Sequence, residues 1–311
     1  MGFMDLFPTI CSALLLFLCW RCLVPLALII FRYTAGQKLY SKRKKLRTAG
    51  EWAIITGGTD GIGRAFAEEL ASDGLSIMLI SRNITKLESV STEIKTKYNV
   101  PVRYIVADFT QVDIYESIRD ELSTLSSIAC LINNVGMVNV DPVEFALDDD
   151  MRVEKVQQFL ACNCLSAASL THIVLPRLVA QNSGSAVINV SSFSGCTPLP
   201  YLTLYGATKA FVRQLSCSLE FELRGKNIIV QTLAPMYVAT SMVRDKRGTF
   251  IISPRQCAKS SLDMLGVETL CMGHIIHALQ IFYFSLVPQS RFNESMLGKL
   301  QRARIRKSQV G

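Results

Sequence analysis

Tyr205 and Lys209 have the residue types and the spacing of a proton-transfer pair. They stand four residues apart in YGATK, and the segment that follows, FVRQLSCSLEFEL, has helical periodicity, so both side chains would share one helix face. A free tyrosine has a pKa of about 10, and a neighbouring ammonium favours the phenolate, which moves the pKa of the phenol towards neutrality. The pair predicts a catalytic acid with its activating cation; the alternative is an exposed helix pair.

A serine hydroxyl precedes this pair by thirteen residues, since Ser192 lies in NVSSFSG at the end of a predicted strand. From that place its side chain could hydrogen-bond the same substrate oxygen that Tyr205 protonates. Ser192 is therefore predicted to be both a catalytic and a substrate-binding residue.

A glycine-rich loop follows the first predicted strand and opens a helix, with the sequence TGGTDGIG over residues 56–63. Glycines in this position allow the backbone to approach a pyrophosphate at a helix N-terminus. The spacing differs from the GxxxxGK[ST] loop of nucleotide triphosphatases, and no lysine follows, which excludes that class. We predict a dinucleotide site formed by Gly57, Thr59, Asp60, Gly61, Ile62 and Gly63.

The next predicted strand ends in LISRN, where a dehydrogenase that uses NAD would carry an acid for the ribose 2′-hydroxyl. Ser81 and Arg82 occupy this position instead. A guanidinium can pair with a 2′-phosphate, so Arg82 predicts NADPH/NADP+ as the cofactor. A solvated arginine that opens the helix predicted over residues 84–98 is the alternative.

Short apolar runs alternate with helix-period stretches from residue 51 onward, which predicts β-α units and a parallel sheet. The predicted strands are rich in Ile and Val and apolar on both faces, as expected for a sheet that helices cover on both sides. They span residues 51–56, 75–81, 101–108, 128–134, 185–192 and 227–235. The predicted fold class is α/β: a doubly wound parallel sheet of Rossmann type in a single domain, with an N-terminal membrane anchor.

In their order and spacing these motifs resemble the short-chain dehydrogenase/reductase family over nearly all of residues 50–250. The resemblance implies that Tyr205 donates the proton, that Lys209 lowers its pKa and binds the nicotinamide ribose, and that Ser192 orients the carbonyl. It further implies that Asn163 holds a relay water, that Asp108 bonds the adenine and that Asn134 lines the cofactor. Two positions depart from the family pattern, namely Val135 in NNVG and the segment APMYVAT after the sixth strand.

More narrowly, the chain resembles the branch that holds 17β-hydroxysteroid dehydrogenases of types 3 and 12 and the very-long-chain 3-oxoacyl-CoA reductases. The resemblance rests on an anchor, LISRN, DFT, NNVGM and PLPYLTLYGATKAFV. It implies NADPH-dependent reduction of a lipidic ketone at the endoplasmic reticulum, although the chain ends in RKSQVG rather than in a dilysine retrieval signal. A retinoid or other alcohol dehydrogenase and a catalytically inactive scaffold are the alternatives.

Residues 10–31 form an apolar run of 22 residues with one charge, Arg21, which is long enough to cross a bilayer. Arg21 and Pro25 leave a hairpin or an interfacial segment as alternatives to a single crossing. Residues 32–47 carry seven Lys/Arg and no acid, so we expect the chain beyond them to face the cytosol and these cations to lie at the membrane surface.

The predicted organisation is an anchor with a basic segment at 1–47, a Rossmann-type catalytic domain at 48–290 and a basic tail at 291–311. The central part counts 19 basic against 23 acidic residues, which excludes a nucleic-acid-binding domain. A homodimer is possible. No metal site is predicted, because His274 and His277 lack further ligands at a suitable spacing. For the apolar residues 270–288 we favour a substrate-pocket or membrane-contact segment over a second crossing.

Overall fold

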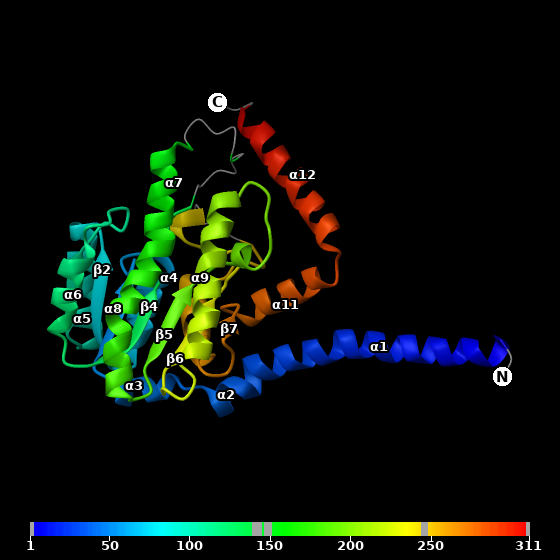
Figure 1. The fold of residues 1–311 in the computed structure, drawn as a ribbon, viewed down its shortest axis with the longest axis horizontal. Helices are drawn as coiled ribbons and strands as arrows, with labels where there is room; N and C mark the ends of the chain where they lie inside the picture. The colour runs from blue at the N-terminus through cyan, green and yellow to red at the C-terminus, as the bar shows by residue number, and fades with distance from the viewer. Residues whose placement is uncertain (1–2, 139–144, 146–150, 244–247, 309–311) are drawn as a thin grey trace.

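A single parallel sheet organises the catalytic part of the computed structural model, which describes residues 3–138, 145, 151–243 and 248–308. Its strand order is β3-β2-β1-β4-β5-β6-β7 (Figure 1). The chain adds β2 and β3 on one side of β1 and then crosses over to add β4 to β7 on the other side. The strands are β1 Trp52–Thr56, β2 Ser76–Ser81, β3 Val102–Val106, β4 Ile128–Asn133, β5 Ala186–Val190, β6 Ile229–Leu233 and β7 Leu270–Cys271. The predicted doubly wound fold is confirmed.

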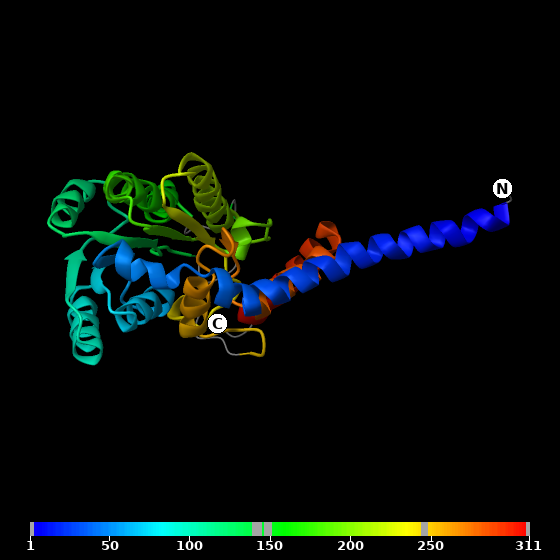
Figure 2. The same cartoon turned by 90° about the horizontal axis from the view of Figure 1, so that it is seen from below.

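Helices cover both faces of the sheet (Figure 2). One layer comprises α4 Gly61–Ser72, α5 Ile84–Tyr98 and α10 Pro254–Asp263; the other comprises α6 Tyr115–Ser123, α8 Ser166–Gln181 and α9 Thr203–Glu222. Each layer closes its own apolar core: Phe66 and Leu70 of α4 pack on one side of the sheet, and Leu170 and Val174 of α8 on the other. This explains why the central strands β1, β4 and β5 are buried at every position and mostly apolar, rather than apolar at alternate positions.

The seventh strand was missed from the sequence. Leu270 and Cys271 pair with Thr232 and Leu233 at the sheet edge, inside the apolar stretch 270–288. Two residues are too few to show a strand period, so only the neighbouring strand reveals them. The remainder of that stretch forms helix α11, Ile275–Ser285, and α12, Gln289–Ser308, follows it.

A long apolar helix, α1 Phe3–Phe31, projects from the body of the molecule (Figures 1 and 2). It runs without a break through Pro25, so the structure does not contain the hairpin considered above. Among the described residues two helical stretches are long and apolar enough to span a membrane, Ile10–Ala49 and Val153–Gln181. The second contains α8 and is largely buried against the sheet, whereas the apolar window of the first is unburied.

The chain after α1 packs onto the catalytic body through a π-helix at Arg32–Gly36, α2 Gln37–Tyr40, a 3₁₀ turn at Arg43–Lys45 and α3 Leu46–Ala49. Tyr33 and Leu46 are buried in the core formed with α4 and α10. The predicted boundary at residue 47 stays a prediction, but these side chains before it belong to the core of the domain after it.

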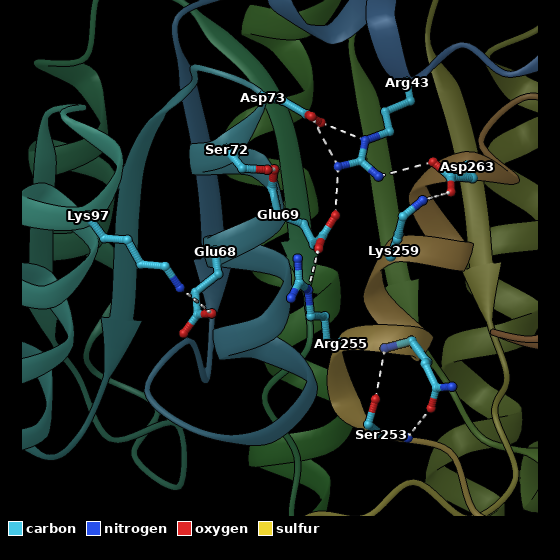
Figure 3. A network of polar contacts seen from close by, with 11 residues as sticks. Arg43, Glu68, Glu69, Ser72, Asp73, Lys97, Ser253, Arg255, Lys259 and Asp263 are labelled. Carbon is cyan, nitrogen blue, oxygen red and sulfur yellow. Dashed lines mark hydrogen bonds and ion pairs between the residues drawn. The ribbon is translucent and has the colours of Figure 1, made fainter.

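Arg43 is the centre of a polar network that joins this segment to α4 and α10 (Figure 3). Its guanidinium contacts Glu69 at 2.9 Å, Asp73 at 2.6 Å and Asp263 at 3.0 Å. Arg32 likewise pairs with Glu268 at 2.7 Å. We expected the seven cations of residues 32–47 at the membrane surface; these two instead neutralise carboxylates of the catalytic body.

Candidate active site

The glycine loop between β1 and α4 has a backbone that side chains would obstruct. Gly57 and Gly61 have φ angles of 61° and 54°, in the left-handed region. A Cβ at Gly63 would collide with the carbonyl oxygen of Gly57 and with the Asn134 amide. The loop therefore leaves its backbone and the N-terminus of α4 open for close approach by a phosphate group.

Asp60 caps α4, accepting a hydrogen bond from the Gly61 N–H at 2.7 Å. Its other carboxylate oxygen accepts from the Ser241 hydroxyl at 2.6 Å, which ties the segment after β6 to the glycine loop. Thr59 and Ser81 hydroxyls lie 3.2 Å apart and connect the loop to the end of β2. The glycine loop is therefore held by two contacts, one with the segment after β6 and one with the end of β2.

Asn134 fixes the end of β1 from the neighbouring strand β4. Its amide nitrogen donates to the carbonyl oxygens of Thr56 at 3.0 Å and Gly57 at 3.2 Å. The Thr56 hydroxyl accepts from the backbone N–H groups of Asn134 and Val135 at 2.9 Å each. Asn134 thereby shapes the glycine loop as well as lining the space beside it.

Tyr205 and Lys209 lie on successive turns of α9, and the Lys209 nitrogen is 5.8 Å from the centroid of the Tyr205 ring. The Lys209 ammonium donates to the Val190 carbonyl at 2.9 Å. Ser192 follows β5 and caps the short 3₁₀ turn Phe193–Gly195, so its hydroxyl accepts from the Ser194 N–H at 3.3 Å and from the Ser194 hydroxyl at 3.1 Å. With its lone pairs occupied in this way, the Ser192 hydroxyl has its own proton left to donate, and Tyr205 is one of its hydrogen-bond partners.

Burial has the largest effect on the pKa values of Tyr205 and Lys209. It raises the pKa of the Tyr205 phenol above its usual value, and the hydrogen bond with Ser192 partly lowers it again. Burial lowers the pKa of Lys209 to about 8. In the structure burial dominates the pKa of Tyr205 and Ser192 supplies the opposing effect, so the predicted lowering by Lys209 stays a prediction.

Asn163 lies in the π-helix Ala161–Leu165, which interrupts the helix formed by α7 Val153–Leu160 and α8. The extra residue in this turn directs the Asn163 amide towards α9, where it donates to the Thr208 hydroxyl at 2.9 Å. It also exchanges hydrogen bonds with the backbone of Met137 at 2.8 and 3.0 Å. Asn163 is almost fully buried.

A cavity of about 440 Å³ brings most of the predicted residues together at the carboxyl ends of the strands. The predicted residues that line it are Gly57, Thr59, Asp60, Gly61, Ile62, Arg82, Asn134, Ser192, Tyr205 and Lys209. Gly63, Asp108 and Asn163 are not among its lining residues. Asp108 instead accepts two hydrogen bonds from Thr110, at 3.0 and 3.1 Å. The predicted adenine contact of Asp108 stays a prediction.

Comparison with known proteins assigns the chain to a family. The family described as "short chain dehydrogenase" matches residues 51–249, which contain the glycine loop, Ser192 and Tyr205. The chain belongs to the short-chain dehydrogenase family. This short-chain dehydrogenase is an oxidoreductase, and the family implies a small-molecule substrate and a cofactor.

Three similar proteins extend the comparison. A protein named very-long-chain 3-oxoacyl-CoA reductase from Bos taurus is 45% identical over 231 residues, which is 74% of this chain and 73% of the relative. A 7β-hydroxysteroid dehydrogenase structure has a TM-score of 0.73 at 23% identity, covering 80% of this chain and 98% of that one. A short-chain dehydrogenase from Sphingobium yanoikuyae, solved in complex with NADPH, has a TM-score of 0.65 at 25% identity and covers 78% and 94%.

Several lining residues of this short-chain dehydrogenase escaped the sequence analysis. Lys86 lies in the first turn of α5, where its N–H donates to the N-cap Asn83, and it lines the cavity together with Arg82. Its place in the first helical turn after β2 could have revealed it. The segment after β6 supplies Pro235, Met236, Val238, Thr240, Ser241 and Met242. No sequence period marks such loop residues. The segment APMYVAT, which departs from the family pattern, nevertheless lies in this part of the cavity lining.

Proposed function

We propose that this protein is a membrane-anchored, NADPH-dependent reductase of a lipidic ketone, with a 3-oxoacyl-CoA as the favoured substrate. The convergence of Ser192, Tyr205 and Lys209 in one cavity with the glycine loop carries the proposal. A pseudoenzyme would have no chemical reason to keep these three groups together.

The cavity suits NADPH at both of its ends. The glycine loop and the α4 N-terminus provide backbone N–H groups for the pyrophosphate, and Arg82 and Lys86 provide two cations at the end of β2 for the 2′-phosphate. When bound, NADPH supplies the hydride for the ketone carbon. A similar structure solved with NADPH supports this assignment.

The chain's own residues handle the oxygen and the proton. Ser192 donates a hydrogen bond to the ketone oxygen and orients the carbonyl for reaction. Tyr205 gives its phenolic proton to that oxygen as negative charge develops there, so that the product leaves as an alcohol. Lys209 stabilises the tyrosinate that remains and bonds the nicotinamide ribose. We infer that Asn163, which Met137 and Thr208 hold in position, orders a water that returns a proton through Lys209.

Two observations support a lipidic substrate. The relatives named very-long-chain 3-oxoacyl-CoA reductase cover most of this chain. A small recess that shares Tyr205 with the main cavity is lined mainly by apolar and aromatic residues, among them Met151, Phe159 and Tyr201, with Thr203 as a polar exception. A 17-ketosteroid is the second candidate, since another relative is named hydroxysteroid dehydrogenase-like protein 1.

The proposed location is the endoplasmic reticulum membrane, with α1 as the anchor and the catalytic domain in the cytosol. The exposed apolar surface of α1 and the excess of Lys/Arg in residues 32–47 support this orientation. The proposed domains are 1–47, 48–290 and 291–311. A homodimer is also proposed, supported by exposed apolar side chains at Leu165, Phe211 and Phe221.

The deciding experiment is turnover of the purified, detergent-solubilised protein with NADPH against a long-chain 3-oxoacyl-CoA and a 17-ketosteroid in parallel. We expect the acyl-CoA to be reduced with the higher kcat/KM. Higher kcat/KM for the steroid would reassign the substrate, and faster alcohol oxidation with NAD+ would favour the alcohol dehydrogenase alternative.

Tyr205→Phe tests the mechanism in the same assay. The variant lacks only the proton-donating hydroxyl, so ketone reduction should fall by at least about a hundredfold, while NADPH binding, followed by fluorescence titration, stays nearly unchanged. If Tyr205→Phe keeps more than a few per cent of the turnover, the assigned proton donor is wrong. Absence of any turnover in the wild type would favour the scaffold alternative.

A further inference from the structure

One face of the anchor helix is partly covered, and the covered residues form a regular stripe. Cys19, Cys22, Pro25, Leu26 and Ile29 are half-buried, whereas the residues between them are exposed. These positions recur at three- and four-residue steps, so they share one side of α1. From Cys19 to Ile29 the stripe measures about 15 Å along the helix axis, at about 1.5 Å per residue.

Helix α11 lies along this face and contacts α1. Both views show α11 leaving the catalytic body close to where α1 enters it and on the same side, and in Figure 1 the two helices diverge towards the far end of α11 (Figures 1 and 2). Its 11 residues extend about 16 Å, which matches the length of the stripe. Ile29 of α1 and Ile275 and Ile276 of α11 pack against the same core at the base of the pair.

The sequence around α11 is typical of a segment that enters one leaflet of a bilayer without crossing it. Residues 269–290 contain no Lys, Arg, Asp or Glu, and Glu268 and Arg291 stand at the two ends. Tyr283 and Leu286 nevertheless remain 64% and 46% exposed at the far end of the helix. A helix of about 16 Å reaches only the middle of a hydrocarbon core of about 30 Å, so it cannot cross.

We propose that α11 is a second membrane segment, which enters the leaflet on the catalytic-domain side beside α1 and turns back at Pro288. The inference rests on the proposed anchoring of α1. If residues 10–31 lie in the hydrocarbon, residues 21–31 occupy the half nearest the catalytic domain, which holds all of the stripe except Cys19, and α11 lies at this depth. Figure 1 shows α12 turning away from α1 at this point. The basic residues of the tail after Arg291 then meet the headgroups.

This placement gives the lipid chain of the substrate a direct approach to the active site. Phe284 of α11 and Phe292 of α12 have ring centroids 4.8 Å apart, and both contact Phe193, at 6.5 and 6.3 Å. Phe193 is the residue after Ser192. The aromatic cluster therefore connects the end of α11 to the turn that carries the catalytic hydroxyl. We infer that an alkyl chain leaving the leaflet beside α11 follows this cluster towards Ser192.

Depth-dependent fluorescence quenching in bilayers tests the insertion. The full-length Trp20→Phe, Tyr283→Trp variant is reconstituted in phosphatidylcholine–phosphatidylserine vesicles with bromine on the lipid chains, where buried Trp52 serves as the unquenched reference. We expect strong quenching at position 283. Trp20→Phe, Tyr104→Trp is the matched control, since Tyr104 is exposed on the edge strand β3 and should stay unquenched.

Quenching of the wild-type protein separates the insertion of α11 from the anchoring of α1, because Trp20 of α1 reports on the anchor itself. Quenching of Trp20 without quenching at position 283 would overturn the insertion of α11 and leave the anchor intact. If Trp20 is not quenched, the anchor fails and the inference fails with it.

Leu286→Lys tests the approach of the substrate. In vesicles this variant should raise the KM for a membrane-partitioned long-chain 3-oxoacyl substrate at least fivefold and leave turnover of a short, water-soluble ketone unchanged. Tyr104→Lys, the matched control, should change neither. Equal KM values of Leu286→Lys and wild type for the long-chain substrate would refute this route.

Discussion

At the scale of single residues, Lys209 makes cofactor affinity depend on pH. Burial lowers its pKa to about 8 in the free protein, so the ammonium is lost as the pH rises above that value. Ribose and phosphate favour the charged form, so binding above about pH 8 must take up a proton, and NADPH affinity should fall by up to about tenfold per pH unit. Fluorescence titration between about pH 7 and 9.5 measures this fall.

Lys209→Met is the control for that titration. The variant should bind NADPH more weakly at neutral pH, and its affinity should be nearly flat over the same range. The same slope in the variant and in the wild type would assign the titration to another group.

Arg82 and Lys86 together should determine the choice of nucleotide. A charged hydrogen bond contributes about 1.5–3 kcal/mol, so we expect NADPH to be preferred over NADH by at least about tenfold in kcat/KM. Arg82→Ala should remove most of this preference, Lys86→Ala a part of it, and the double variant all of it. Constants for NADH serve as the control, because NADH lacks the 2′-phosphate. A preserved preference in the double variant would mean that other residues bind this phosphate.

At the scale of elements, Arg43 should be the residue that holds the post-anchor segment on the catalytic body. Its side chain is 13% exposed and faces three carboxylates, among them that of Glu69, which is 8% exposed. Arg43→Ala removes one cation from these carboxylates, while Glu69 keeps Arg255 at 3.2 Å and Asp263 keeps Lys259 at 2.8 Å. We therefore expect a loss of stability smaller than the about 3–5 kcal/mol that a fully broken buried pair costs. Chemical denaturation in detergent should show this loss of stability.

Arg43→Lys and Lys44→Ala are the matched variants for this measurement. Lysine keeps the charge but cannot bond three carboxylates at once, so it should restore only part of the stability. No described contact ties Lys44 to a carboxylate, and its removal should have little effect. Equal losses in Arg43→Ala and Lys44→Ala would show that the network adds nothing measurable.

At the scale of the whole molecule, the orientation in the membrane is directly testable. Protease added to intact microsomes should digest the catalytic domain, because the Lys/Arg excess that follows α1 is retained on the cytosolic side. Asn83 is an exposed glycosylation sequon and should stay unmodified, whereas Asn189 is fully buried and reports nothing. Protection of the domain, or a glycan on Asn83, would reverse the orientation.

The sequence by itself determined the parts of this protein that depend on local pattern. The β-α alternation, the glycine loop and the YGATK helix each lie within a short segment, where strand and helix periods and glycine spacing are readable. Six of the seven strands and ten cavity-lining residues were therefore predicted among the described residues.

Only the tertiary structure determined the features that require contact between segments far apart in the sequence. The edge strand β7 exists because β6 lies beside it, and Lys86 and Ser241 become site residues because β2 and β6 end at the same cavity. Arg43 looks like its basic neighbours in the sequence, and only the folding of α4 and α10 brings three carboxylates to it. The pKa of Tyr205 follows the same logic, since burial is a property of the packed molecule and not of the four-residue spacing.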